Sequence, residues 1–327
     1  MDAVPYSFVD AVVELFDKVT LDTLASEPFH PLWKEVVDTH HRNRLYTRVK
    51  FRQKNGTIQC AFENDTVPLL SIDQIKVVGC KFVRIDSLIV DNSAEISWDD
   101  GVVVEEHAAD KMVQLVAPFC TPVRSCSVLS VMRASSDFQA AILQSLYKKH
   151  CFTNVDMSYS GPAAIDFLED HIDNNRLMKR IELFGDWPES VLPLLRKFCF
   201  QTERRRHLRL HRMGCFSWML DWTFIEEFFA YWRANGTFEC LLQYRSPSHR
   251  RHYYEFMKNA RNEISKPDRA SFHYLEHEEV PSLAQGFTAG GDVMEELFIK
   301  LEFMRCHCTS KEVCYEHEKL AMLRNPN

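Results

Sequence analysis

VPYSFVDAVVELFDKVTLDTLASEPFHPLWKEVVDTHHRNR, residues 4–44, is the stretch around which the rest of the chain is organised. Behind its opening Val-Pro pair the apolar residues recur at helical spacing, and a proline suits the fixed φ of a first helical turn. Thr20 is the expected N-cap of a second, short helix, because its hydroxyl can accept a hydrogen bond from a backbone N–H of the first turn. Pro28 and Pro31 interrupt the chain, and a third helix follows them.

The three predicted helices carry more apolar surface than they can bury against one another. A segment of about 40 residues is too short for a self-sufficient core. The remaining apolar surface must therefore cover another part of this chain or enter a groove of a partner protein. The apolar positions at helical spacing are Phe8, Val9, Val12, Val13, Leu15, Phe16, Leu21, Leu24, Leu32, Trp33, Val36 and Val37.

The order of these features resembles an F-box: a proline near the start, an apolar helix, a short Leu-x-x-Leu helix, and then Leu-Trp-x-x-Val-Val at residues 32–37. Residues 4–44 are also similar to nematode proteins that join an F-box-like N-terminus to a variable C-terminal domain. The F-box-like motif covers residues 1–45, and the resemblance to the nematode family covers most of the chain. Val4 stands where leucine is commoner in this pattern, and residues 28–31 interrupt the run into the helix of Trp33.

This resemblance implies that the chain is a substrate-recognition adaptor of a Skp-cullin-F-box ubiquitin ligase. Residues 1–45 would bind a Skp-family adaptor protein, and the C-terminal part would bind a target protein that the sequence does not identify. The adaptor contacts that the family's apolar motif implies are Pro5, Phe8, Val9, Leu15, Leu24, Leu32 and Trp33. The alternative is a stand-alone interaction protein whose N-terminal helices only cap its own α/β domain, as terminal repeats require.

The composition is that of an ordinary globular chain, with 46% hydrophobic and 26% charged residues among 327. A net charge of −7 and a pI near 6.1 argue against nucleic acid or a membrane as a partner. The N-terminus has no basic region and no sustained apolar run, so we expect neither a signal peptide nor a transmembrane helix. Eleven scattered cysteines then predict a reduced, cytoplasmic or nuclear setting.

Strand signals replace helical ones after Arg44. Residues 46–51 and 57–62 alternate in polarity around Asn55-Gly56, which is the strongest short signal for a β-hairpin. Two further strand pieces are predicted at 82–85 and 88–90.

Short apolar strands then alternate with helices at a nearly constant period. The strand centres 129–131, 155–157, 181–183 and 208–210 begin 26, 26 and 27 residues apart (155−129, 181−155, 208−181). A fixed period with one strand and one helix is typical of an α/β solenoid, so we predict a leucine-rich-repeat-like arrangement without the leucine-rich consensus. An ordinary open α/β sheet with right-handed crossovers is the alternative. The helices are predicted at 108–119, 137–150, 162–174, 188–200 and 221–234, and a fifth strand at 240–242.

The predicted fold class is therefore α/β. A three-helix F-box-like segment at 1–45 precedes an α/β target-recognition domain at 46–327, whose repeat-like core spans about 108–245. Residues 245–269 are predicted to form a helix and a loop. Strands at 271–276 and 297–304, with Gly286, Gly290 and Gly291 in the linker, predict a β-hairpin-like C-terminal cap.

The repeat strands predict a protein-recognition face. If their apolar residues point into the core, the alternate residues form an outer row along one face of the sheet. A row that mixes acidic, basic and aromatic groups is typical of a surface that binds protein, although solvated strand residues would explain it equally well. The target-binding candidates in this row are Asp156, Glu182, Phe184, Arg209, His211 and Gln243, with Ser130 and Ser158 beside them.

The residues indicate no enzyme and no cofactor. The sequence contains no phosphate-binding glycine motif, no G-x-S-x-G elbow and no H-E-x-x-H. Cys306, Cys308, Cys314 and His317 are residue types that suit zinc, but their spacing matches none of the usual structural zinc sites. Whether they bind a metal is left open.

Three polar stretches have alternative interpretations. The basic runs 203–212 and 248–254 fit an acidic or phosphorylated protein segment better than nucleic acid in a chain that is acidic overall. His40-His41 could be a pH-sensitive pair, although a helix C-terminus favours histidine through its dipole in any case.

Overall fold

The chain divides into two compact units, Met1–Met178 and Lys179–Asn327, and each is a mixed α/β structure. The predicted boundary at residue 45, between the F-box-like segment and the target-recognition domain, concerns function and stays a prediction. The computed structural model describes residues 4–28, 30–54, 57–64, 70, 72–79, 81–92, 102–105, 114, 116, 119, 126–149, 152–200, 206–211, 222–235, 239–246, 261–265, 270–276, 282–290 and 297–305.

The first unit begins with three helices, α1 (Tyr6–Glu14), α2 (Lys18–Ser26) and α3 (Pro31–Asn43). Pro31 occupies the first turn of α3, as its fixed φ favours. The expected N-cap at Thr20 is wrong, because the carboxylate of Asp17 accepts the backbone N–H of Thr20 at 2.8 Å. Asp17 lies three residues earlier, so Thr20 takes the position of the donor that an N-cap satisfies.

The three helices form an apolar cluster of their own. Val9, Val13, Leu21, Val36 and Val37 are almost completely buried in it. The half-buried side chains that pack against this cluster are Val4, Phe16, Leu24, Ala25, Leu32 and Trp33. The three helices therefore bury part of their apolar surface against one another, although about 40 residues are few for a core of their own.

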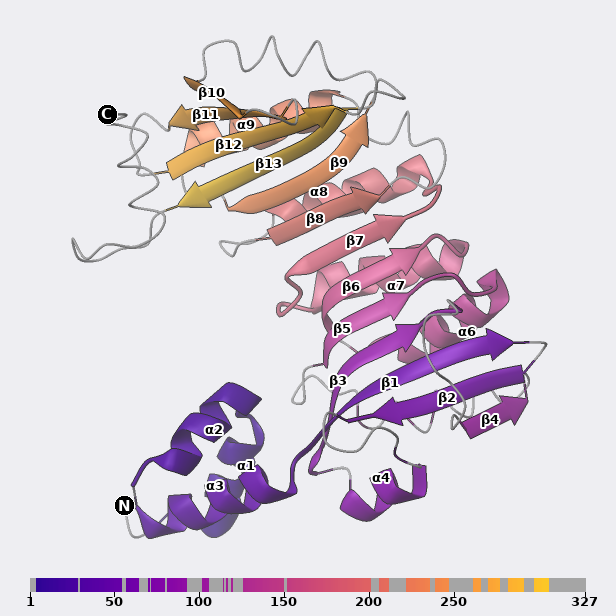
Figure 1. The fold of residues 1–327 in the computed structure, drawn as a ribbon, viewed down its shortest axis with the longest axis vertical. Helices are drawn as coiled ribbons and strands as arrows, with labels where there is room; N and C mark the ends of the chain where they lie inside the picture. The colour runs from indigo at the N-terminus through magenta and orange to yellow at the C-terminus, as the bar shows by residue number, and fades with distance from the viewer. Residues whose placement is uncertain are drawn as a thin grey trace. The chain divides into compact units, whose positions relative to one another are not determined.

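The sheet of the first unit has the strand order β6-β5-β3-β1-β2-β4. Strands β1, β3, β5 and β6 run parallel, while β2 is antiparallel to β1 and to β4 (Figure 1). Helices α6 and α7 lie behind β5 and β6 in Figure 1. The elements are β1 (Leu45–Lys54), β2 (Thr57–Glu63), α4 (Ile72–Val78), β3 (Val83–Val90), β4 (Val102–Glu105), β5 (Cys126–Val131), α6 (Ser136–Leu146), β6 (Phe152–Ser158) and α7 (Pro162–Asn174).

Several local predictions are confirmed here, and one is corrected. The hairpin of β1 and β2 pairs Lys54 with Thr57 around the expected turn. Helix α7 has the predicted bounds. The two strand pieces expected at 82–85 and 88–90 are one strand, β3, because a register shift against β1 accommodates the extra residue Asp86 without ending the strand. The helix expected at 108–119 lies outside the described residues, apart from three isolated positions.

The second unit continues the alternation of strand and helix. Its parallel strands are β7 (Arg180–Phe184), β8 (Arg206–His211) and β9 (Cys240–Ser246). A 3-10 turn, Glu189–Val191, leads into α8 (Leu192–Phe200), and α9 (Trp222–Asn235) precedes β9. Helices α8 and α9 lie behind these strands in Figure 1. The aromatic side chains Phe224, Phe228, Phe229 and Trp232 of α9 are buried, and the last three contact the buried Phe303.

The C-terminal part of the second unit is an antiparallel meander. It consists of β10 (Arg261–Ser265), β11 (Ala270–Glu276), β12 (Ser282–Gly290) and β13 (Leu297–Arg305), and β13 also pairs with β9. Two predictions are corrected. The glycine-bearing linker is itself a strand, β12, and part of the expected helix-and-loop at 245–269 is β10. Glycine weakens a strand signal, but pairing with two neighbours provides hydrogen bonds that local propensity does not report.

Two arginines join the N-terminal helices to the sheet by capping the C-terminus of α1. Arg44, which is 9% exposed, donates from Nη2 to the carbonyl of Val13 at 2.6 Å and from Nη1 to the carbonyl of Phe16. Arg84 of β3 donates from Nη2 to the carbonyl of Glu14 at 3.3 Å. The last carbonyls of a helix have no partner within it, and a cation also complements the negative end of the helix dipole.

His40 and Asp10 extend this junction. Because a guanidinium only donates, His40 Nδ1 accepts from Arg44 Nη2 at 3.4 Å, and its Nε2–H therefore donates to Asp10 Oδ1 at 2.9 Å. Lys81 completes the group with 2.7 Å contacts to both oxygens of Asp10. Burial lowers the pKa of His40, and this effect outweighs the hydrogen bond to Asp10. His41 of the suggested pair instead faces Asp22, at 3.3 Å.

We predict that Arg44→Ala loosens α1. The change leaves the carbonyls of Val13 in α1 and of Phe16 just after α1 without their charged donor, which we expect to cost about 3 kcal/mol of local stability. Hydrogen exchange of the α1 amides, followed by mass spectrometry, should accelerate by about a hundredfold. Arg42→Ala on the exposed side of α3 removes an arginine of the same helix and should change the exchange little. Equal effects of the two substitutions would contradict the capping role.

We predict a pH dependence that His40 carries. Its pKa in the folded state is below the unfolded value of 6.5, so its contribution is fully present above pH 6.5 and is lost as the pH falls toward the folded pKa. The urea concentration at the unfolding midpoint should therefore decrease when the pH is lowered from 7.5 to 5. His40→Gln keeps a donor and an acceptor but cannot titrate, so it should flatten this component. His207 has a lowered pKa too and acts in the same direction, which makes the difference between wild type and His40→Gln the informative quantity.

Candidate protein-binding surfaces

Helix α1 is apolar on two sides. Val9 and Val13 face the buried cluster, whereas the α1 outer stripe, defined as Phe8, Ala11, Val12 and Leu15, follows the i, i+3, i+4, i+7 spacing of a second helix face. Phe8 is 56% exposed and Leu15 is 60% exposed. Tyr6 on α1 and Val19 on α2 are also exposed large hydrophobic side chains. An exposed apolar group of this kind is typical of a binding surface.

The predicted adaptor contacts separate into three groups. Pro5, Phe8 and Leu15 are exposed, so a partner can reach them directly. Val9 is completely buried in the cluster. Leu24, Leu32 and Trp33 are half-buried and pack against that cluster.

The outer face of the second unit carries a polar row across four neighbouring strands. The register aligns Glu182 of β7 with Arg209 of β8, Arg209 with Gln243 of β9, and Gln243 with Lys300 of β13. The residues on either side of this row, such as Ile181, Leu208 and Leu242, are buried on the other face. The prediction that the two sets alternate is therefore confirmed for this unit.

Glu182 is the electrostatic centre of this row. Its side chain is 9% exposed and lies 3.4 Å from Arg180 Nε and 3.7 Å from Arg209 Nη1. Burial lowers the pKa of the neighbouring His207, while the charge of Glu182 and the side chain of Gln243 act in the opposite direction. Glu182 thus neutralises the neighbouring charges of Arg180 and Arg209, and the side chain of Arg209 remains 41% exposed to solvent.

The other target-binding candidates lie in different places. Asp156 belongs to the first unit, in a register row with Lys50, Ile89 and Ser130. Phe184 at the end of β7 is half-buried and pairs in register with His211, whose side chain lies outside the description. The structure therefore gathers Glu182, Arg209 and Gln243 in one row.

Sequence reasoning missed three members of the outer face of the second unit. Arg180 and His207 pair in register with each other, two residues before Glu182 and Arg209 on the same strands. Lys300 pairs with Gln243 and so extends the row of Glu182 onto β13. Arg180 and His207 could have been found by continuing the two-residue alternation one step along β7 and β8. Lys300 carried no such signal, because β13 is distant in sequence and pairs antiparallel with β9.

Two groups of candidate residues are not covered by the structure. Cys306, Cys308, Cys314 and His317 lie outside the described residues, as do the basic run 248–254 and residues 203–205 and 212 of the other basic run. Within the described ranges, His, Cys, Asp and Glu side chains form no group of three that could hold a metal ion. A search of the same ranges for a helix long and apolar enough to cross a membrane finds none.

Comparison with known proteins gives no relative, since no family model, no curated protein and no solved structure matches this chain. The arrangement of its own residues is therefore the basis for any functional proposal.

We predict that Glu182→Ala and Arg209→Ala differ in their structural cost. Removing Glu182 takes away the largely buried carboxylate that lies beside both Arg180 and Arg209, which we expect to cost about 2 kcal/mol. Removing the more exposed Arg209 should cost less than about 1 kcal/mol. Urea unfolding of the full chain, followed by circular dichroism, measures both. A larger loss for Arg209→Ala would contradict the assignment of Glu182 as the compensating centre.

Proposed function

We propose that this chain is a substrate-recognition adaptor of a Skp-cullin-F-box type ubiquitin ligase. In this proposal residues 1–45 are an F-box-like segment that binds a Skp-family adaptor protein. The observation that supports it best is the α1 outer stripe, because Phe8 and Leu15 remain exposed although the three helices already have their own buried cluster.

The energetics of the stripe favour a partner. Complete burial of a leucine or phenylalanine side chain contributes about 1.5–3 kcal/mol. Phe8 and Leu15 lie seven residues apart, so both can enter one groove from the same side of α1. The buried cluster and the arginine caps hold α1 in place, and a rigid helix loses little conformational entropy when it binds.

The alternative function is a stand-alone interaction module whose N-terminal helices cap the α/β domain. The junction of Arg44, Arg84, Asp10 and Lys81 favours this alternative, since it attaches the helices to the first unit. Those contacts use the C-terminus and inner side of α1, and they leave the outer stripe exposed. Attachment to the domain and adaptor binding are therefore compatible.

The target would bind the outer face of the α/β domain. Arg209 and Lys300 present cations there beside the acidic Glu302, a mixture suited to a polar protein surface. The β–α order within each unit supports the leucine-rich-repeat-like arrangement that the period of the sequence predicts. The proposed protein performs no chemistry itself and acts by holding a target close to the ubiquitin-carrying enzyme.

The proposed setting is the cytoplasm or nucleus. The free thiols of Cys60, Cys199 and Cys240 support it, since all three are buried and unpaired by disulfides. Burial raises the pKa of Cys60 to about 12, which keeps this thiol protonated and unreactive.

We predict that Phe8→Ser with Leu15→Ser abolishes capture by a purified Skp-family adaptor. Both side chains are exposed, so the double variant should keep the helical content and unfolding midpoint of the wild type. The expected loss of affinity is at least about a hundredfold, as two apolar anchors are removed. Size-exclusion chromatography and isothermal calorimetry with the full chain measure the complex.

Val77→Ser is the matched control, because Val77 is 87% exposed on α4 and lies outside the stripe. Deletion of residues 1–45 is a poorer test, since it also removes Arg44 from the junction. If the wild-type chain folds but does not bind the adaptor, the adaptor proposal is wrong and the capping alternative is favoured. Binding that both variants retain equally would exclude the α1 outer stripe as the contact.

A further inference from the structure

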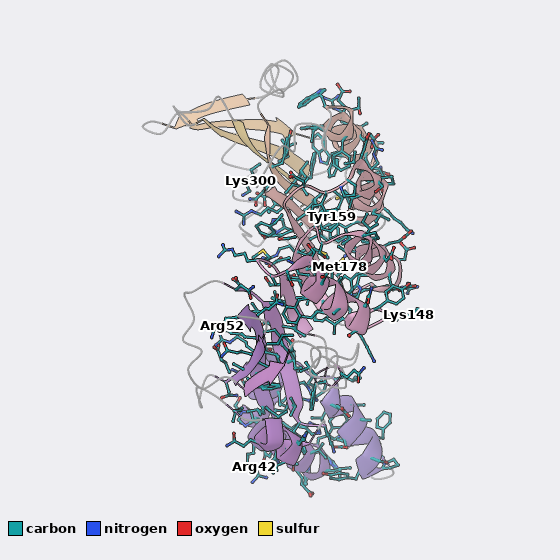
Figure 2. The ribbon with its side chains drawn as sticks, turned by 90° about the vertical axis from the view of Figure 1, so that its right-hand side faces the viewer. Arg42, Arg52, Lys148, Tyr159, Met178 and Lys300 are labelled. Carbon is teal, nitrogen blue, oxygen red and sulfur yellow. The ribbon has the colours of Figure 1, made fainter. Side chains whose placement is uncertain are left out.

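A groove runs between α6 and α7 on the helical side of the first unit. It encloses about 910 Å³. In Figure 2 the label of Lys148 marks this helical side, and the label of Arg52 marks the opposite side of the same unit. The residues that line the groove are Ala140, Leu143, Gln144, Tyr147, Ser160, Pro162, Ala163, Asp166, Glu169, Asp170, Asp173 and Asn174.

One wall of the groove is acidic along the whole of α7. Asp166, Glu169, Asp170 and Asp173 follow one another at three- and four-residue spacing, so their carboxylates share one helix face. Like charges at this spacing destabilise a helix, and Asp173 also lies in the last turn, where the helix dipole disfavours a negative charge. A cationic partner would lower this repulsion by adding opposite charges along the acidic stripe.

The four carboxylates do not serve the fold equally. Asp170 is buried and accepts hydrogen bonds from the backbone N–H of Lys148 and from Asn174 Nδ2, both at 3.0 Å, so its role is structural. Asp166, Glu169 and Asp173 are exposed along the wall. These three residues are the ones that a partner can reach.

The floor of the groove supplies an independent indication of an occupant. Ser160 lines it, is 9% exposed, and its Oγ has no hydrogen-bond partner among the described residues. A buried hydroxyl without a partner is unfavourable, and a ligand with a polar group can satisfy it. Ala140, Leu143 and Tyr147 of the facing helix are apolar, and Tyr147 is 44% exposed.

We propose that the groove between α6 and α7 binds an amphipathic helix of a partner protein that carries lysine or arginine on one face. The apolar face of that helix would pack against Ala140 and Tyr147. Its cations would pair with Asp166, Glu169 and Asp173, and one of them would donate to Ser160 Oγ on the floor. The three carboxylates span about 10 Å along α7, which is the rise of two helical turns. Cations spaced three or four residues apart on the bound helix match this distance.

The charge of the groove selects this class of partner against others. A nucleic acid or an anionic lipid surface would be repelled by the acidic stripe. In the described part of the chain these carboxylates belong to no group that could hold a metal ion, so a single divalent cation is a poorer match than a row of separate ammonium or guanidinium groups. Lys148 follows α6, and its ammonium lies 5.4 Å from the ring centre of Tyr147.

This binding surface is independent of adaptor binding, because none of its residues belongs to the α1 outer stripe. A partner helix in the groove would bind whether or not a Skp-family adaptor does.

The test uses the full chain and a fluorescein-labelled peptide of two heptads, built from leucine on one face and lysine on the other. Fluorescence anisotropy at low salt should report saturable binding that weakens as salt is added. The triple variant Asp166→Asn, Glu169→Gln and Asp173→Asn should bind about tenfold more weakly, because three exposed charge pairs are lost. Ala140→Lys should also reduce binding, since it places a competing cation in the groove.

Two controls separate a specific groove from general attraction to an acidic protein. The variant Glu35→Gln, Asp186→Asn and Glu226→Gln removes the same number of exposed carboxylates elsewhere and should bind like the wild type. The same peptide with glutamate in place of lysine should not bind. Equal weakening in both triple variants, unchanged binding in the groove variant, or binding of the glutamate peptide would each overturn the proposal.

Discussion

The capping of α1 by two guanidinium groups is the interaction on which the N-terminal half depends. Arg44 follows α3 directly, and Arg84 lies in β3, yet both donate to carbonyls at the C-terminal end of the same short helix. A nine-residue helix is marginal by itself, so long-range partners for its terminal carbonyls decide whether it persists. The same contacts connect the three helices with the first parallel strands of the sheet.

This constraint decides which side of α1 is exposed. Once the C-terminus is held against β3, Val9 and Val13 face inward and Phe8 and Leu15 cannot follow them. His40 stabilises this arrangement only as a neutral imidazole, because its Nδ1 must accept from Arg44. The attachment of the helices to the domain thus creates the apolar surface that the proposed adaptor would use.

The two faces of the α/β units offer different chemistry to partners. On the outer face of the second unit, paired charges on β7, β8 and β13 leave Arg209 accessible, while Glu182 compensates Arg180 and Arg209. On the helical side of the first unit, four carboxylates of α7 line one groove. A chain with an overall charge of −7 therefore presents a mixed surface in its second unit and an acidic groove in its first.

The sequence by itself determined the type and order of most elements, because helix periodicity, strand alternation and turn residues are local signals. It gave the bounds of α7 and the Asn-Gly hairpin of β1 and β2. Only the tertiary structure decided which stripe of α1 is buried, that a glycine-bearing linker pairs as β12, and that α6 and α7 form an acidic groove. These outcomes depend on contacts between residues far apart in sequence, such as Arg84 with Glu14, and local periodicity carries no information about them.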